Sequence, residues 1–288
     1  MSIEYTFFYG IRGNYVDVTS KMYNRLNEKN YITIPTTDVE RVTTFGDHIY
    51  GVKKHILIVH DKHSFIVEND RQITINLNPF NPKSTKLYHY YHLWVAGHTD
   101  LWKHIFNEHL DNLILSKLLF HLESFYIGFV GPKDKIALAK EILKTRGINY
   151  ISAIETDSGY EQVTQNKLYE FSLNNDGYVL YSHNKGSFHP SHYSISWRNA
   201  MEYHNILNWK FALEKLQNVD AVGIHWLTPD VSPDFPLPFF GGTYWWSHLS
   251  YIRKLGYPKN NTRYDAENWI GVLPNIRIID MKPGFPHY

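Results

Sequence analysis

The spacing of apolar residues divides the chain into two regions. Over residues 1–78, short β-branched or aromatic runs alternate with polar turns, a pattern typical of strands. The expected strands cover residues 3–10, 14–19, 31–35, 55–60, 64–68 and 72–77, and one short helix is expected over 20–29. Residues 1–80 are therefore predicted to form a small all-β, sandwich-like domain.

The stretch NPFNPKS, residues 78–84, carries two prolines among polar turn formers and is interpreted as a linker. After it, apolar runs with strand spacing alternate with runs of helical spacing. Strands are expected over 86–95, 124–131, 148–154, 177–183 and 220–226, and helices over 100–120, 133–147, 160–175 and 194–218.

Such alternation predicts an α/β domain over residues 85–288, with a mainly parallel sheet that helices flank on both faces. Ligands of such sheets bind beyond the carboxyl ends of the strands. That rule places residues 183–186, and the loop after Trp226, at the functional edge of the sheet.

Composition narrows the classes of function. The formal net charge of +1 gives no electrostatic reason to expect DNA, RNA or an acidic membrane as partner. The chain has no cysteine, which excludes disulfides, thiolate zinc sites and cysteine nucleophiles. The 8 Trp, 22 Tyr and 16 Phe residues either fill the core or line a groove in which aromatic faces stack on sugars or bases.

No apolar run approaches the roughly 20 residues that span a bilayer. The N-terminal MSIEYTFFYGIRGNY also lacks the basic and then apolar pattern of a signal peptide. We therefore expect a soluble, cytoplasmic protein without a transmembrane segment. The 17 histidines raise the hypothesis of a metallohydrolase, which is disfavoured because no HExxH or similar ligand spacing occurs.

Five stretches with chemical character occur in a fixed order: YVLYSHNKG, SWRNAMEYHNILNW, VDAVGIHW, FFGGTYWWSHLSYIRKL and RYDAENWIG. Over about residues 86–275 they resemble a family of GT-A-type glycosyltransferase-like proteins from bacterial surface-polysaccharide clusters and large viruses. The corresponding stretches of that family read approximately HTKG, WR..M.Y, HFSGNFWW and RYDAEFWIG. The resemblance implies a GT-A-like fold, and transfer of sugar from a nucleotide-diphosphate sugar to a glycan or other hydroxyl acceptor. For a viral protein, the cytoplasm would be that of the host.

The donor side is expected at His183, Asn184 and Lys185. In many nucleotide-sugar enzymes this strand ends in two acidic residues that hold a metal, but SHNKG offers no such pair. The sequence requires no cofactor. Binding of a divalent ion such as Mn²⁺ or Mg²⁺ is an open alternative that no acidic pair at this strand end supports. Lys185 and a hydrogen bond from His183 would instead offset charge on the departing diphosphate. The alternative is a turn of solvated polar groups.

Two further features belong to the same edge. Arg198, in SWRNAMEY, is a second candidate for the diphosphate because its planar fork suits phosphate oxygens. The nearest acidic pair is Glu155 and Asp157, in IETD, and it precedes a predicted helix. A helix-capping role therefore competes there with metal binding.

The acceptor side is expected around FFGGTYWW. Gly241 and Gly242 allow backbone to approach a ligand closely, Thr243 follows them, and Trp245 and Trp246 supply flat apolar faces. Because neighbouring residues of a strand point to opposite faces, one of the two tryptophans is expected in the core.

The resemblance implies a carboxylate general base for an inverting transfer, which takes the proton from the attacking hydroxyl. Glu267 in RYDAENW is the better match and Asp265 the reserve. The alternative is that both are carboxylates favoured by the dipole at a helix N-terminus.

The chain departs from the family at FFGGT, where Phe239 and Thr243 replace a histidine and an asparagine, and this difference bears on acceptor identity. The N-terminal region resembles, more weakly, a small β-module fused to various viral and bacterial proteins. No function follows from that similarity beyond binding or homo-oligomerisation.

A second hypothesis for the whole chain is a carbohydrate-binding protein that retains the glycosyltransferase fold without turnover. Only the enzyme requires a nucleotide and a reactive carboxylate.

Overall fold

The computed structural model describes residues 5–28, 30–60, 63–67, 73–76, 85–97, 99–187, 191–230, 236–262 and 264–282. The chain divides into two compact units, residues 1–80 and 81–288. The segment 78–84, interpreted above as a linker, lies outside the described residues.

The described part of the N-terminal unit contains two antiparallel sheets. The first has the order β2 (Asn14–Asp17), β1 (Tyr5–Ile11), β4 (His55–His60) and β5 (His63–Val67), and the second pairs β3 (Tyr31–Ile34) with β6 (Ile73–Asn76). Both sheets contribute to one apolar core. The helices among the described residues of this unit are α1 (Thr19–Tyr23) and α2 (Asp38–Phe45).

The expectation of an all-β unit is therefore wrong at α2. Thr37 caps this helix by accepting a hydrogen bond from the backbone N–H of Glu40. Phe45 and Arg41 are fully buried, and Arg41 donates to the carbonyls of Pro35 and Val67. A threonine three residues before a glutamate is a known signal for a helix start, and it precedes α2 in the sequence.

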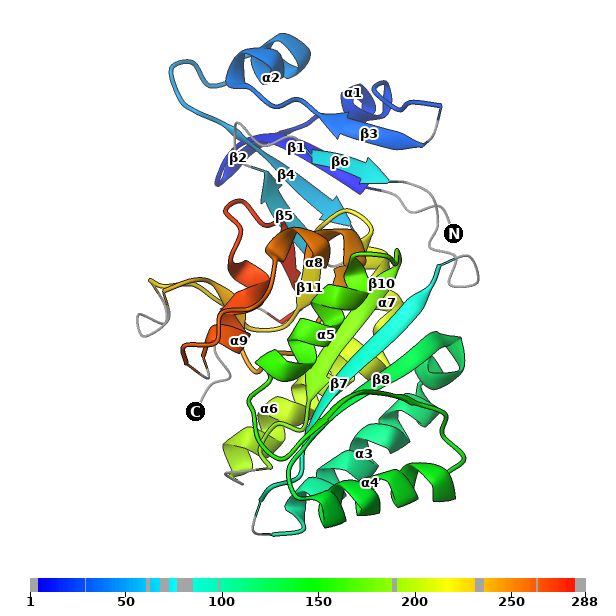
Figure 1. Ribbon diagram of the computed structural model, residues 1–288. Helices are drawn as coiled ribbons and strands as arrows, with labels where there is room; N and C mark the ends of the chain where they lie inside the picture. The colour runs from blue at the N-terminus through cyan, green and yellow to red at the C-terminus, as the bar shows by residue number, and fades with distance from the viewer. Residues whose placement is uncertain are drawn as a thin grey trace. The chain divides into compact units, whose positions relative to one another are not determined.

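The larger unit is built on a seven-stranded sheet (Figure 1). The strand order is β15 (Ile278–Asp280), β11 (Ala221–Gly223), β14 (Trp245–His248), β10 (Tyr178–His183), β7 (Leu87–Trp94), β8 (Leu122–Val130) and β9 (Ile151–Thr156). Only β14 runs antiparallel to its neighbours. The prediction of an α/β unit with a mainly parallel sheet flanked by helices is confirmed.

The described helices of this unit are α3 (Leu101–Leu115), α4 (Lys133–Thr145), α5 (Gln162–Ser172), α6 (His192–Glu202), α7 (Trp209–Leu216), α8 (Leu249–Leu255) and α9 (Asp265–Asn268). Single turns lie at Leu118–His121, Tyr203–Leu207 and Trp269–Gly271, and β12 (Trp226–Leu227) pairs with β13 (Phe239–Phe240). No helix in the described ranges is long and apolar enough to cross a bilayer.

Helices cover both faces of the central strands. Tyr90 of β7 packs on Phe171 of α5, whereas its neighbour Tyr91 stacks on Phe106 and His109 of α3. Every residue of β7 except Trp94 is buried. This is why β7 is an almost continuous apolar and aromatic run rather than an alternating one.

Two predicted helices are interrupted. The run expected as one helix over 194–218 is α6, a π-helical turn at Tyr203–Leu207, and α7. The run expected over 100–120 ends at Leu115, because Lys117 takes a left-handed backbone conformation (φ 62°) before a short 3-10 turn. Apolar spacing continues through both breaks and does not reveal them.

The order of the strands creates a topological switch point. The chain passes from β7 to β8 and β9 on one side, and then returns so that β10 pairs with the other side of β7. Crevices that bind ligands in open α/β sheets form where the strand order reverses, outside the carboxyl ends. Here that place is between the ends of β7 and β10.

Candidate functional site

Asn184 closes the switch point. Its amide oxygen accepts a hydrogen bond from the backbone N–H of Trp94 (3.0 Å), and its amide nitrogen donates to the carbonyl of Trp94 (2.7 Å). The side chain is buried and extends the pairing of β10 with β7. Both amide groups are thus used within the fold, so the assignment of Asn184 as a donor contact is corrected to a structural role.

His183, the last residue of β10, contacts the carboxylate of Glu161. The imidazole Nδ1 lies 2.8 Å from the carboxylate Oε1, and each side chain is 15% exposed. Glu161 immediately precedes α5, so a helix start and a strand end meet at the edge of the sheet. Glu161 is not among the site residues predicted from the sequence, because no motif or local spacing links it to His183.

The electrostatics of this pair keep Glu161 ionised. Burial raises the pKa of Glu161, but the charge and hydrogen bond of His183, with help from the charge of Lys185, outweigh burial, so the pKa lies below its usual value. Beside the pair, burial lowers the pKa of His92 to about 4. His92 is therefore neutral at pH 7, and its Nδ1 is hydrogen-bonded to the hydroxyl of Thr164 (2.9 Å).

Lys185 lies two residues further on, at the same edge. Its ammonium sits 4.7 Å from the centroid of the Trp197 ring, a cation–π contact with α6. Within the described part of the chain it forms no ion pair with a carboxylate. A second lysine, Lys135 of α4, donates to the carbonyl of Gly97 just after β7. The edge thus carries two lysines together with the ionised carboxylate of Glu161.

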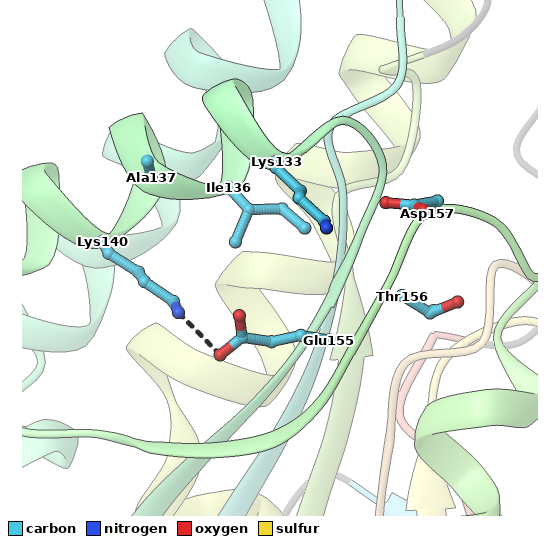
Figure 2. Close-up of a pocket in the computed structure, with 7 residues that line it drawn as sticks. All are labelled: Lys133, Ile136, Ala137, Lys140, Glu155, Thr156 and Asp157. Atoms are coloured by element: carbon cyan, nitrogen blue, oxygen red, sulfur yellow. Dashed lines mark hydrogen bonds and ion pairs between the residues drawn. The ribbon is translucent and has the colours of Figure 1, made fainter.

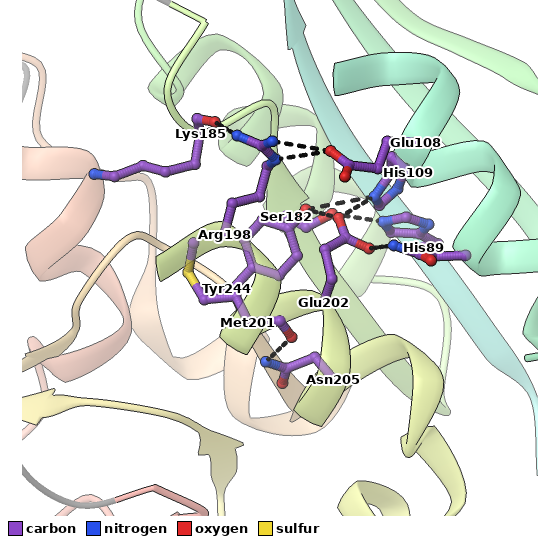
Figure 3. Close-up of polar contacts among 11 residues, drawn as sticks. His89, Glu108, His109, Ser182, Lys185, Arg198, Met201, Glu202, Asn205 and Tyr244 are labelled. Atoms are coloured by element: carbon purple, nitrogen blue, oxygen red, sulfur yellow. Dashed lines mark hydrogen bonds and ion pairs between the residues drawn. The ribbon is translucent and has the colours of Figure 1, made fainter. Parts of the chain in front are cut away.

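Arg198 is not free for a ligand. The guanidinium is buried, contacts Oε2 of Glu108 from Nε (3.2 Å) and from one terminal nitrogen (2.9 Å), and donates to the carbonyl of Lys185 (3.2 Å). Figure 3 shows the fork between Glu108 and the Lys185 backbone, while the Lys185 ammonium points away from it. The assignment of Arg198 as a direct donor contact is corrected: it fixes the backbone that carries Lys185.

A buried polar network lies one turn further along α6 (Figure 3). Glu202 Oε1 accepts from the Tyr244 hydroxyl (2.6 Å) and lies 2.7 Å from Nδ1 of His109, while Oε2 accepts from Asn112 (3.3 Å). Burial raises the pKa of Glu202, but His109 and the hydrogen bonds outweigh it and leave the pKa below its usual value. The network ties α3, α6 and the segment before β14 together.

A groove of about 490 Å³ opens between α4 and the carboxyl end of β9 (Figure 2). Its polar lining consists of Lys133, Lys140, Glu155, Thr156 and Asp157. Lys140 contacts Glu155 at 2.6 Å, and this hydrogen bond is the main reason that the pKa of Glu155 is lowered. The carboxyl of Glu155 is thus engaged by Lys140, and the residues predicted as the nearest acidic pair line this groove.

The two glycines of FFGGT make room for α6 rather than for a ligand. A Cβ at Gly241 would lie 2.7 Å from the Trp197 ring, and one at Gly242, where φ is +82°, would lie 2.6 Å from the sulfur of Met201. Both glycines are buried. The sequence predicts that another part of the structure approaches the backbone closely at these glycines, and this is observed. What approaches is α6 rather than a ligand. The assignment of Gly241 and Gly242 as acceptor contacts is therefore corrected.

Trp245 and Trp246 are both fully buried. Trp245 stacks on Tyr181 (centroids 5.2 Å apart), and the indole nitrogen of Trp246 donates to the carbonyl of Asn205 (2.8 Å). Neither ring presents a face to an acceptor, because helices cover both faces of the sheet at β14. The expectation that one of the two rings would do so is wrong.

Thr243 is also buried, and its backbone is left-handed (φ 53°). It lies inside the packed loop, so its assignment as an acceptor contact is corrected as well.

The two candidate bases belong to α9. Oδ2 of Asp265 accepts from the backbone N–H groups of Asn261 and Thr262, both at 2.8 Å. Asp265 therefore holds the turn before α9, and it lies in the first turn of that helix, where the alternative expected a carboxylate favoured by the helix dipole. Glu267 is half-buried on the same short helix.

Contacts from α5 fix the position of α9. Gln162 donates to the carbonyl of Thr262 (2.7 Å), and Gln165 donates to the carbonyl of Ala266 (2.9 Å). Both glutamines lie in the first turns of α5, which begins directly after Glu161. Glu267 thus stands on a helix docked to the element that starts beside His183. In the described ranges, no three His, Asp or Glu side chains are grouped so that they could hold a metal ion.

The fold and this edge define an α/β protein with a mostly parallel seven-stranded sheet. At its switch point lie a contact between a histidine and a carboxylate, and a lysine. Residues 90–262, more than half of the chain, match the family described as "Domain of unknown function (DUF8361)", and the chain belongs to that family.

A solved structure of 4-diphosphocytidyl-2C-methyl-D-erythritol synthase from Anaerococcus prevotii is similar over 70% of this chain and 88% of its own, with 12% sequence identity and a TM-score of 0.39. The comparison with curated proteins gave no match.

Proposed function

We propose that the protein is a glycosyltransferase that moves sugar from a nucleotide-diphosphate sugar to a hydroxyl acceptor, such as a glycan, with inversion. The observation that carries this proposal is the placement of His183 and Lys185 at the end of β10, beside the switch point. The five sequence stretches that resemble GT-A-type glycosyltransferases support assigning the sheet to that type.

The chemistry of the donor explains why such an edge is needed. The leaving group is a nucleoside diphosphate, and its negative charge grows as the bond to the sugar breaks. Fixed cations directed at that charge stabilise the transition state more than the ground state. Lys185 and His183 supply this stabilisation in the proposal, and Arg198 with Glu108 holds the loop that carries them.

The acceptor side rests on Glu267. A hydroxyl attacks the anomeric carbon readily only if a base within hydrogen-bond reach takes its proton. The resemblance of RYDAENW to the family assigns the base to Glu267, and Asp265, which accepts from two backbone N–H groups, is the reserve.

The first test is a thermal-shift screen of the full chain against nucleotide-diphosphate sugars, with EDTA and with Mn²⁺. We expect at least one nucleotide to raise the melting temperature, because a ligand that binds only the folded state stabilises it. A shift in EDTA supports stabilisation of the leaving group by the protein's own cations, and a shift that needs Mn²⁺ points to a metal. A shift with glycans but with no nucleotide supports the carbohydrate-binding alternative.

The second test concerns Lys185. Changing Lys185 to Ala removes the ammonium beside Trp197 and should weaken donor binding or slow transfer at least tenfold, about 1.4 kcal/mol. Calorimetric donor binding and transfer rates measure the effect. Lys144→Ala, on the exposed side of α4, is the matched control and should leave both unchanged. Unaltered kinetics in the Lys185 variant would remove this residue from the site.

A further inference from the structure

The loop that carries Lys185 is held by one face of α6. Ser194, Trp197 and Arg198 follow one another at helical spacings of three and four residues or fewer, so they lie on the same side of the helix. Arg198 donates to the carbonyl of Lys185 (3.2 Å). The next residue, Gly186, has a left-handed backbone (φ +86°), and a Cβ there would lie 3.1 Å from the hydroxyl oxygen of Ser194. The backbone of the loop is therefore fixed against α6 at two consecutive residues.

Trp197, on the same face, contacts the Lys185 side chain. The ammonium lies 4.7 Å from the centroid of the indole ring. Within the described ranges, no hydrogen bond or ion pair reaches that ammonium, and the side chain is half-buried. A lysine stem is long and flexible, so contact with the ring restricts the positions that the charge can take.

An aromatic ring restrains a cation differently from a carboxylate. A carboxylate would neutralise the ammonium and would compete with an anionic ligand for it. The face of an aromatic ring attracts the cation through its quadrupole and carries no net charge. The contact with Trp197 therefore suits a lysine that is held in place and still presents its full positive charge to an anion.

The Trp197 ring is itself fixed by its neighbours. Tyr193, one turn earlier on α6, meets it edge-on with ring centroids 5.4 Å apart, and His225 meets it edge-on at 6.0 Å. The ring also packs where Gly241 lacks a Cβ, which would lie 2.7 Å from it. The indole nitrogen is buried and has no hydrogen-bond partner among the described residues. The ring therefore acts through its aromatic surface and not through its N–H group.

We propose that Trp197 is a positioning residue that holds the Lys185 ammonium, by a cation–π contact, in the place from which it acts on the diphosphate of the donor. The proposal rests on the function proposed above. A charge that is already in place stabilises the leaving group without the cost of reorganising the side chain during the reaction. Trp197 acts through Lys185 and not by contact with the substrate.

The affinity of the full chain for inorganic pyrophosphate, measured by calorimetry, tests this role. Trp197→Leu replaces the ring by an apolar side chain, and it should weaken binding by about fivefold or more, because the cation–π contact is lost. Trp197→Phe keeps an aromatic face and loses only an N–H group that makes no hydrogen bond among the described residues. Its affinity should therefore stay within about twofold of the wild type.

A double-mutant cycle separates this role from a general effect on the fold. In the Lys185→Ala background there is no ammonium to hold, so Trp197→Leu should change the affinity by less than about twofold. Tyr203→Leu, at an exposed aromatic residue directly after α6, is the control and should bind pyrophosphate like the wild type.

A second measurement reads the contact itself, without a ligand. In a chain that carries isotope-labelled lysine, the ε-methylene signal that disappears in Lys185→Ala belongs to Lys185. The ring current of an indole shifts a group above its face upfield, so this signal should lie upfield of those of exposed lysines and move to their position in Trp197→Leu. If that variant does not fold, or if pyrophosphate binds Lys185→Ala too weakly to measure, the wild-type signal and the affinity of Trp197→Phe decide the question.

An equal loss of affinity from Trp197→Leu in both backgrounds would show a purely structural role and overturns the proposal. The proposal also fails if Trp197→Leu binds like the wild type, if Trp197→Phe binds as weakly as Trp197→Leu, if the Lys185 signal is not shifted, or if the wild-type chain does not bind pyrophosphate. The outcome is separable from the proposed function. A chain that shows the expected pattern but transfers no sugar retains this inference, whereas a chain that transfers sugar without that pattern retains only the function.

Discussion

Replacing Glu202 by Ala should lower the free energy of unfolding of the larger unit by about 3–5 kcal/mol, the usual cost of removing one partner of a buried ion pair. Glu202 is only 3% exposed. Its carboxylate takes contacts from His109, Tyr244 and Asn112, and each would lose that partner in the interior. An unsatisfied buried polar group costs much more than the net gain from a typical hydrogen bond.

Tryptophan fluorescence during denaturant unfolding measures this effect in the right unit, because all eight tryptophans lie between residues 94 and 269. Glu141→Ala, on the exposed surface of α4, is the control and should change stability by less than about 0.5 kcal/mol. A loss in the Glu202 variant no larger than in this control would contradict the role given to the network.

The difference in the free energy of unfolding between the wild type and the Glu202 variant should depend on pH. The pKa of Glu202 is lower in the folded state than its ordinary value. Its contribution to stability is therefore complete above about pH 4.3, the value of an unfolded glutamate, and is lost as the pH falls through the folded pKa. The difference between wild type and variant should shrink below pH 4.

Replacing Glu267 by Gln should cut the rate of transfer by roughly a hundredfold or more, since the amide keeps the shape of the side chain but cannot take a proton. A factor of a hundred corresponds to about 2.7 kcal/mol in the activation free energy. Donor affinity should change little, because the base acts on the acceptor hydroxyl. Transfer rates and calorimetric donor binding are measured together with the melting temperature of the variant.

Asp265→Asn is the companion variant. Because Asp265 holds the backbone of Asn261 and Thr262, its replacement should lower the melting temperature more than it lowers the rate per folded molecule. If Glu267→Gln transfers sugar at the wild-type rate and Asp265→Asn does not, the base is Asp265. If neither change affects the rate, the inverting mechanism with a carboxylate base is wrong.

The elements that the sequence predicts correctly are those with strong local patterns. The run from Leu87 to Trp94 is a strand with both faces covered, and the helical spacing of residues 133–147 forms α4. The rule that ligands bind beyond the carboxyl ends of parallel strands directs attention to residues 183–186, where the structure places the switch point. These features follow from the periodicity of apolar residues and from the direction of the strands, and both can be read from short stretches of sequence.

The site itself could be predicted only in part. His183 and Lys185 lie where the sequence places them, whereas Asn184 and Arg198 turn out to be bonded within the fold. A motif records which residue types occur near an edge, but it does not record which of them the packed neighbours already satisfy. That distinction separates a residue that holds the site from one that faces a ligand.

The sequence by itself determined the α/β alternation and the edge of the sheet at which residues 183–186 lie. It also determined that another group packs closely against the backbone at Gly241 and Gly242. Only the tertiary structure decided that this contact is with Trp197 and Met201 of α6, and that Glu161 meets His183 across 22 positions of the chain. The physical reason is that secondary structure follows from local periodicity and backbone sterics. The partner of a buried glycine or carboxylate depends instead on which distant segments the sheet order brings together.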